Sequence, residues 1–389
     1  MLNFNFYSPT EFVFGRGVEN EVGKYVCRYG GKKVLIVYGG GSAVRSGLLD
    51  RVKASLQAYG VEYVEMGGVM PNPTDTKVYE GIEICRKNHV DMLLPVGGGS
   101  VIDCAKAVAA GTIYDGDFWD FYEGKTIERA LPVGVVLTIP AAGSEGSGNS
   151  VITKVSIQKK ISIRAPHTLR PVFAIMNPEL TFSLPPYQTA CGAVDMMAHI
   201  QERYFNNTPE TLVTDSLSEA LLRDIIALTP RVLAKPDDYD ARANLEWCGT
   251  LAHNGLCGTG VEEDWASHAI EHELSAIYGV AHGAGLAVIF PAWLTWMLTH
   301  NDSKLKQWAK NVWNADTPEE GIKRYKQFLH SIGMPTNMKE LGIENPDVDL
   351  LSNRLHEHKG EKVGAYVKLD REDTREIYRI AATNSVSSR

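Results

Sequence analysis

Five side chains in two short windows have the types and spacing of a metal site. Asp195 and His199 are four positions apart in a segment with a helical pattern, which places both on one helix face. His268 and His272 repeat this spacing, and His282 follows ten positions later. One carboxylate and three imidazoles suit a first-row divalent metal, Fe(II) or Zn(II). The pattern therefore predicts a metal centre in the second half of the chain.

The second window also matches a metallopeptidase motif. The segment 268–272 reads H-x-x-E-H, in which both histidines bind zinc and the glutamate acts as the base. Under that alternative, Asp195, His199 and the glycine-rich segments of the first half have no role. The remaining histidines have no such company in the sequence and are predicted to be structural or on the surface: His89, His167, His253, His300, His330, His356 and His358.

A glycine-rich turn in the first half predicts an anion site. Gly97, Gly98 and Gly99 follow an apolar segment, and a helical pattern begins at Ser100. Successive glycines let the backbone turn tightly and approach a ligand without side-chain obstruction. The free N–H groups and the positive dipole end of the helix favour a phosphate. The sequence matches neither the G-x-G-x-x-G nor the G-x-x-x-x-G-K-[ST] fingerprint.

A second glycine cluster, Gly39-Gly40-Gly41-Ser42, also follows an apolar segment. Two glycine-rich strand ends in one sheet suit a long dinucleotide. NAD sites often place Asp or Glu at such a strand end to bind the adenosine ribose hydroxyls. Here position 39 is glycine and Arg45 follows, which favours a 2′-phosphate and hence NADP(H) over NAD(H). Alternatively, Arg45 is only a solvated residue of the first helical turn. The predicted contacts at this cluster are Gly39, Gly40 and Ser42.

The elements that must position these groups change character along the chain. In the first half, apolar strand-like segments (33–38, 61–66, 91–96 and 132–139) alternate with helical patterns such as 44–59 and 74–88. This alternation predicts a parallel sheet covered by helices, with ligands at the carboxyl ends of the strands. From Pro186 onward helical patterns dominate, over 188–204, 211–228, 241–254 and 265–278. We therefore predict an α/β dinucleotide-binding domain over residues 1–185 and an all-α metal-binding and substrate domain over residues 186–389.

Composition excludes several classes of protein. The 389 residues are 44% hydrophobic and 22% charged with a formal net charge of -8, which fits a soluble globular protein. No basic block predicts nucleic-acid binding, and no apolar run approaches the roughly 20 residues of a membrane span. The N-terminus lacks the pattern of a signal peptide. Six scattered cysteines without a C-x-x-C pair suit free thiols in a reducing compartment, so we expect a cytoplasmic protein.

Taken in order, these motifs resemble those of the iron-containing, metal-dependent alcohol dehydrogenases (group III). The resemblance is greatest to the NADPH-dependent butanol dehydrogenase and broad-range aldehyde reductase branch, and it covers nearly the whole chain. The motifs that carry it are Phe12-Val13-Phe14-Gly15, Pro71-Asn72-Pro73, the segments 97–103, 138–145 and 194–199, and His268 with His272 and His282-Gly283.

The resemblance implies a dehydroquinate synthase-like fold of two domains with the site in the cleft, and a homodimer. It places the four metal ligands at Asp195, His199, His268 and His282. His272 matches a histidine near the nicotinamide and the substrate that is not a ligand. The cofactor residues fall on Gly98, Gly99 and Ser100 at the pyrophosphate, with Asp103, Thr138, Ser147 and Lys160 as further contacts. Position 147 departs from the branch, which often has Asn there.

The predicted reaction is reversible hydride transfer between NADP(H) and a small uncharged primary alcohol or aldehyde. The metal is expected to act as a Lewis acid, and His272 either relays the substrate proton or packs beside the ligands. Trp265, Phe290 and Trp293 either border the substrate or belong to the core. Polyol or phosphate dehydrogenases and synthases that use NAD on the same fold are an alternative. Their charged substrates need Lys or Arg, and positions 260–300 contain none. A cofactor fold that has lost catalysis is a further alternative.

Overall fold

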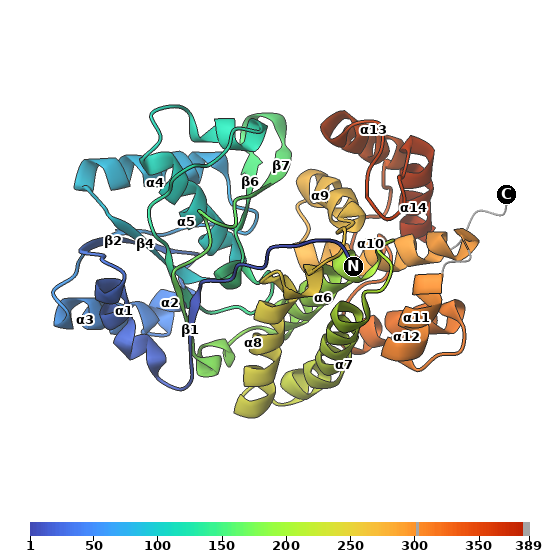
Figure 1. Ribbon diagram of the computed structural model, residues 1–389, viewed down its shortest axis with the longest axis horizontal. Coiled ribbons are helices and arrows are strands. Elements are labelled where there is room, and N and C mark those ends of the chain that lie inside the picture. The colour runs from blue at the N-terminus through green and yellow to red at the C-terminus, as the bar shows by residue number, and fades with distance from the viewer. Residues whose placement is uncertain (301–302, 384–389) are drawn as a thin grey trace. The chain divides into compact units, whose positions relative to one another are not determined.

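A six-stranded parallel sheet organises the first of two compact units, residues 7–183, in the computed structural model (Figure 1). The structure describes residues 1–300 and 303–383. The strand order is β1-β8-β5-β4-β2-β3, and every pairing is parallel. The predicted parallel sheet is therefore confirmed. Its strands are β1 (Glu11–Phe14), β2 (Lys33–Tyr38), β3 (Glu62–Met66), β4 (Met92–Gly97), β5 (Gly134–Leu137) and β8 (Phe173–Met176).

Helices cover both faces of this sheet, because successive side chains of a strand point to opposite faces. On β2, Val34 and Ile36 join one core with helices α1 and α3, whereas Leu35 and Val37 join another with α4 and α5. Figure 1 shows these two pairs of helices on opposite sides of the strands. The helices are α1 (Val22–Arg28), α2 (Ser42–Arg45), α3 (Leu48–Ala58), α4 (Asp75–Asn88) and α5 (Gly99–Thr112). An antiparallel pair, β6 (Asn149–Lys154) and β7 (Lys159–Arg164), completes the unit.

The predicted single helix over 44–59 is wrong. The chain forms α2 and α3 with a break between them, because Gly47 adopts a left-handed conformation with φ of 69°. Glycine reaches this region at little cost, so it ends one helical turn and begins the next helix. The consequence is local, since Leu48 and Leu49 still face the core as the helical pattern requires.

The second unit, residues 1–6 and 184–389, is helical as predicted. Helix α7 continues through Pro230, so the expected end near residue 228 is wrong. Among the described residues, no helix is long and apolar enough to cross a membrane. The helices are α6 (Pro186–Tyr204), α7 (Leu212–Ala234), α8 (Tyr239–His253), α9 (Ala266–Tyr278), α10 (His282–Met297), α11 (Ser303–Trp313), α12 (Pro318–Ser331), α13 (Val348–Lys359) and α14 (Arg371–Thr383).

A glycine contact sets the approach of α10 to α6. A Cβ atom at Gly283 would overlap the backbone carbonyl of Cys191, so only glycine allows the two helices to come this close. The contact lies one residue after His282 on α10 and four residues before Asp195 on α6. The approach of these two backbones therefore determines how near the two predicted ligands lie.

We expect Gly283→Ala to lower the free energy of unfolding by about 1–3 kcal/mol, because the new methyl group meets rigid backbone rather than a movable side chain. Urea denaturation measures the change. Gly40→Ala is the control, since among the described residues no atom lies within 4 Å of its Cβ position. Equal stability of Gly283→Ala and the wild type would show that α6 and α10 separate freely.

Candidate metal centre

Helix α6 supplies the first two predicted ligands. Asp195 and His199 are one turn apart on the same face, and both side chains are buried. The Nε2 atom of His199 lies 3.6 Å from the Oδ1 atom of Asp195. This distance is too long for a hydrogen bond, so the two side chains point toward the same space without bonding to each other.

Helices α9 and α10 bring two further imidazoles to the same carboxylate oxygen. The Nε2 atom of His268 lies 3.9 Å from Asp195 Oδ1, and that of His282 lies 3.7 Å from it. The ligand atoms of Asp195, His268 and His282 all lie within 4.8 Å of one another, and His199 joins them through the Asp195 oxygen. Ligand atoms of a tetrahedral site with bonds of 2.0–2.1 Å are about 3.4 Å apart. The observed spacing is close to that value.

The protonation of these residues also fits a metal. Burial, followed by the neighbouring His282, lowers the pKa of His268 to about 3, and burial also lowers the pKa of His199 well below its usual range. Both imidazoles are therefore neutral, which is the form that binds metal. The buried Nε2 atom of His268 has no hydrogen-bond partner among the described residues. A divalent ion would satisfy this atom, so the donor set fits the ion.

Buried glutamates orient two of the imidazoles. The Nδ1 atom of His268 donates to Glu202 Oε1 at 2.8 Å, and the backbone N–H of His268 donates to the same oxygen at 2.7 Å. Glu271 accepts from His282 Nδ1 and from the Ser275 hydroxyl. With the proton on each Nδ1, each Nε2 lone pair is available to bind a metal.

Sequence reasoning missed Glu202 and gave Glu271 a different role. Glu202 follows His199 by three positions and Glu271 follows His268 by three, so helical spacing could have indicated both as orienting residues. In the peptidase alternative Glu271 is the general base. Its carboxylate is fully buried and holds His282 and Ser275, which leaves it no access to a substrate water.

His272 lies at the edge of the cluster. Its ring centroid is 5.5 Å from that of His282 and 6.4 Å from that of His268. With Glu271 and His282 it forms a second group of mutually close ligand atoms. This position leaves both predicted roles of His272 open, as a proton relay and as a packing residue.

His253, which the sequence predicts to be structural or on the surface, is buried beside the cluster. Its ring, at the end of α8, lies 4.1 Å from that of His199, and its Nδ1 is 3.3 Å from Nη2 of Arg203. Arg203 also donates to the backbone carbonyl of His199 at 2.7 Å. Nothing in the sequence signals this contact, because the α6 and α8 residues meet only through the packing of their helices.

The three aromatic residues considered as substrate neighbours separate into two groups. Phe290 and Trp293 are each 1% exposed and belong to the helical core. Trp265 lies beside the cluster, with ring centroids 5.0 Å from His268 and 5.9 Å from His199. The guanidinium of Arg203 lies 4.7 Å from the centroid of the Trp265 ring, so the tryptophan is held from one side by a cation.

The two glycine clusters lie at neighbouring strand ends of the sheet unit. Strands β2 and β4 are paired, so Gly39, Gly40 and Ser42 follow one strand where Gly98, Gly99 and Ser100 follow the next. Helix α5 begins at Gly99, and no side chain caps its free N–H groups. A Cβ atom at Gly98 would lie 2.9 Å from Ile139, and one at Gly99 would lie 2.8 Å from the Ala142 side chain. Glycine is therefore required for the turn to fit beneath the segment after β5.

The other predicted cofactor residues have internal partners or lie nearby. The backbone N–H of Thr138 donates to the Gly97 carbonyl at 3.1 Å. Asp103 accepts from the Ser144 hydroxyl at 2.6 Å and from the Val151 N–H at 2.9 Å, and burial raises its pKa. Ser147 is buried, and Lys160 lies on β7. Their contact with a cofactor stays a prediction.

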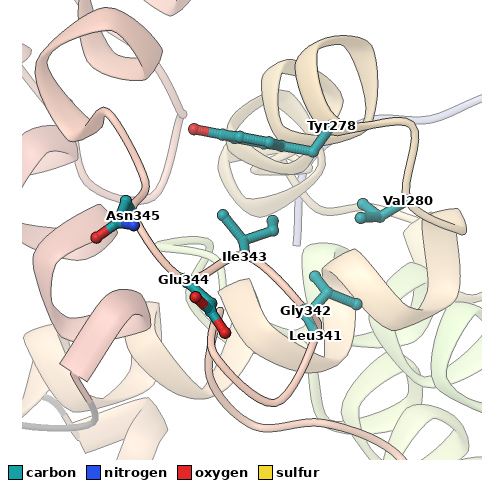
Figure 2. A pocket seen from close by; sticks show the side chains of 7 residues that line it. All are labelled: Tyr278, Val280, Leu341, Gly342, Ile343, Glu344 and Asn345. Atoms are coloured by element: carbon teal, nitrogen blue, oxygen red, sulfur yellow. The ribbon is translucent and has the colours of Figure 1, made fainter.

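A surface pocket of about 470 Å³ lies where α9 ends (Figure 2). Figure 2 shows the Tyr278 ring above Ile343, with Val280 to the right of both side chains. The full lining is Tyr278, Val280, Leu341, Gly342, Ile343, Glu344 and Asn345. None of the residues predicted to bind metal or cofactor is among them, so we assign this pocket no part in the site.

Comparison with known proteins covers nearly all of the chain. The family model for iron-containing alcohol dehydrogenase matches residues 9–178, and the model for the C-terminal part of the Fe-containing alcohol dehydrogenase family matches residues 189–382. NADH-dependent butanol dehydrogenase A of Clostridium acetobutylicum is 39% identical, over 97% of this chain and 99% of that protein. NADPH-dependent aldehyde reductase YqhD of Escherichia coli is 35% identical, over 98% of this chain and 100% of that protein.

A solved structure has the same fold. The crystal structure of NADH-dependent butanol dehydrogenase A from Thermotoga maritima superposes with a TM-score of 0.95 at 42% sequence identity, covering 98% of this chain and 99% of that one. The predicted α/β unit with a helical second part is therefore confirmed.

Replacing His268 by Ala should abolish tight metal binding, because it removes one of the converging imidazoles. Glu202→Gln should weaken metal affinity by about 10–100-fold while keeping the ligand, because it disturbs the orienting partner. Metal content after dialysis against a chelator of known affinity measures both effects. His300→Ala, an exposed histidine outside the cluster, is the control. Stoichiometric metal in His268→Ala would refute the ligand assignment.

Proposed function

The chain belongs to the iron-containing alcohol dehydrogenase family and is an alcohol dehydrogenase, and on that premise we propose that it uses NADP(H) to interconvert a small uncharged aldehyde and its primary alcohol. Aldehyde reduction is the favoured direction of use. The observation that carries the proposal is the convergence of three imidazole nitrogens on the Asp195 oxygen at 3.6–3.9 Å. In keeping with the resemblance of its motifs, we propose a cytoplasmic homodimer.

Asp195, His199, His268 and His282 would hold one divalent ion, Fe(II) or Zn(II). When bound, such an ion supplies Lewis-acid polarisation of the substrate oxygen. The chain's own contribution is orientation, since Glu202 keeps the Nδ1 proton on His268 and Glu271 keeps it on His282. Burial keeps the His268 imidazole neutral, and the Trp265 ring packs beside it.

Hydride transfer also requires movement of a proton to or from the substrate oxygen. His272 is the proposed group, because its ring lies beside His282 without being one of the four ligands. Histidine is the side chain most often used as a general acid or base. Packing beside the ligands is the alternative role.

The glycine-rich turn at Gly98 and Gly99 is the proposed pyrophosphate site. The uncapped N–H groups at the start of α5 and the dipole of that helix both favour a phosphate. Ser100, Asp103, Thr138, Ser147 and Lys160 complete the proposed contacts. Their support is the resemblance of the motifs.

Preference for NADP(H) over NAD(H) is proposed from the first glycine cluster. Gly39 offers no carboxylate to repel a 2′-phosphate. The Nη1 atom of Arg45 would lie 3.1 Å from a Cβ atom at Gly41, so a positive group stands beside this turn. The names of the relatives divide on this point, because the butanol dehydrogenases are called NADH-dependent and the aldehyde reductase NADPH-dependent.

An uncharged substrate is proposed from the charges around the cluster. Positions 260–300 contain no Lys or Arg. The buried cation nearest the histidines, Arg203, is already paired with Glu263 at 3.2 Å. A carboxylate or phosphate on the substrate would therefore lack a partner, which disfavours the alternatives with charged substrates.

The cofactor proposal is tested by following absorbance at 340 nm with butanal. We expect kcat/KM for NADPH to exceed that for NADH. Gly39→Asp should lower kcat/KM for NADPH by about ten-fold or more, because a carboxylate near the 2′-phosphate costs on the order of 1–4 kcal/mol. Gly39→Ala is the control that separates charge from bulk. A wild-type preference for NADH would contradict the proposal, and no turnover of butanal with either cofactor would contradict the function.

A further inference from the structure

Lys106 is a fully buried cation on α5, in the sheet unit. Its Nζ atom donates to the carbonyl and the hydroxyl of Ser144 at 2.7 and 2.8 Å, to the Ser147 carbonyl at 2.8 Å and to the Asn149 carbonyl at 3.0 Å. An ammonium group has three N–H donors, so all its hydrogen-bonding capacity is used. Every one of these partners lies in a single loop, residues 144–149.

A second cation holds the same loop. Arg170 donates to the Gly146 carbonyl, so the carbonyl groups of Ser144, Gly146, Ser147 and Asn149 all turn towards positive charge. Asp103, three positions before Lys106 on α5, accepts from the Ser144 hydroxyl. The loop is therefore fixed against one face of α5, and Figure 1 shows β6, which begins at the end of this loop, beside that helix.

The segment just before this loop, residues 138–142, lies on the glycine-rich turn. Thr138 is bonded to the Gly97 carbonyl, and the positions for a Cβ atom at Gly98 and Gly99 face Ile139 and Ala142. The glycine-rich turn is therefore connected to the 144–149 loop through residues 138–142. The turn presents the uncapped N–H groups of α5, and the loop is held from inside by the Lys106 ammonium.

The ammonium has a free-energy cost that an apolar side chain would not have. Burial lowers the pKa of Lys106 to about 8. The carboxylates of Asp103 and Glu145 oppose this shift, whereas Arg170 adds a smaller lowering effect. A buried cation is weak support for stability, but it specifies one arrangement of the groups that accept its hydrogen bonds. The arrangement that Lys106 specifies is that of the 144–149 loop.

We propose that Lys106 is a positioning residue for the dinucleotide, and that its ammonium holds the 144–149 loop in the arrangement that receives the cofactor. The proposal rests on the proposed function, because it takes the glycine-rich turn to be the cofactor's phosphate site. Lys106 contacts no substrate or reacting atom, so it acts on cofactor affinity through the loop.

The test is Lys106→Met in the metal-loaded enzyme, because Met keeps the length of the side chain and removes the charge. We expect KM and Kd for NADPH to rise ten-fold or more, with kcat at saturating NADPH within three-fold of wild type and KM for butanal unchanged. Amide hydrogen exchange in residues 144–149 should accelerate. Lys53→Met, which removes a lysine of α3 that is paired with Glu65 on β3, is the matched control and should change none of these values.

If Lys106→Met does not fold, Ser144→Ala removes one acceptor of Lys106 and the hydroxyl that binds Asp103. It should also raise KM for NADPH, by a smaller factor.

A folded Lys106→Met with wild-type affinity for NADPH would overturn the proposal, as would equal damage to kcat and to both KM values. Fluorescence titration of the wild type separates the two proposals. A wild type that binds neither NADPH nor NADH would overturn both, whereas equal binding by wild type and variant would overturn only the role of Lys106.

Discussion

The helical unit depends on one constraint: three imidazoles must meet one buried carboxylate oxygen. Three helices supply these groups, so α6, α9 and α10 have to pack at a fixed separation. Gly283 allows the close approach of α10 to α6, and Glu202 and Glu271 fix the rings on α9 and α10. Burial keeps the imidazoles of His199 and His268 neutral, which favours a metal ion over a proton on either ring. The same features that bring the helices together therefore prepare the centre for a metal.

In the sheet unit, the phosphate of the proposed ligand is bound by backbone groups and not by side chains. Its candidate site consists of backbone at the carboxyl ends of β2 and β4, where glycines remove side chains and α5 offers free N–H groups. Backbone can recognise a phosphate only if it is held still, since a mobile loop loses conformational entropy on binding. Lys106 and Arg170 hold the neighbouring loop through its carbonyl groups. Side chains on packed helices thus form one candidate site, and backbone held by a buried lysine and a partly buried arginine forms the other.

Much of this arrangement follows from short-range patterns. The spacing of Asp195 to His199 and of His268 to His272 gives a common helix face directly, and the apolar runs before each glycine cluster predict β2 and β4. The break at Gly47 was missed because the apolar spacing continues across it. The run of α7 through Pro230 shows tertiary packing overriding a local breaker.

Contacts between distant segments are beyond such patterns. His253 lies beside His199 only because α8 packs on α6, and the hydrogen-bond partners of Lys106 are backbone carbonyl groups and one hydroxyl, which no residue pattern indicates. Glu202 is an intermediate case, since its helical spacing from His199 was available but its partner is on α9. The proposed preference for NADP(H) depends on a few residues at one turn, and relatives that match nearly the whole chain are named for either cofactor.

The central claim is that the buried Asp and His cluster is a catalytic metal centre. The most direct measurement strips the wild-type protein of metal with a chelator, confirms its fold by circular dichroism, and follows NADPH oxidation with butanal before and after Fe(II) or Zn(II) is returned. The account predicts that turnover disappears with the metal and returns as one ion binds per chain. Full turnover by folded, metal-free protein would contradict it.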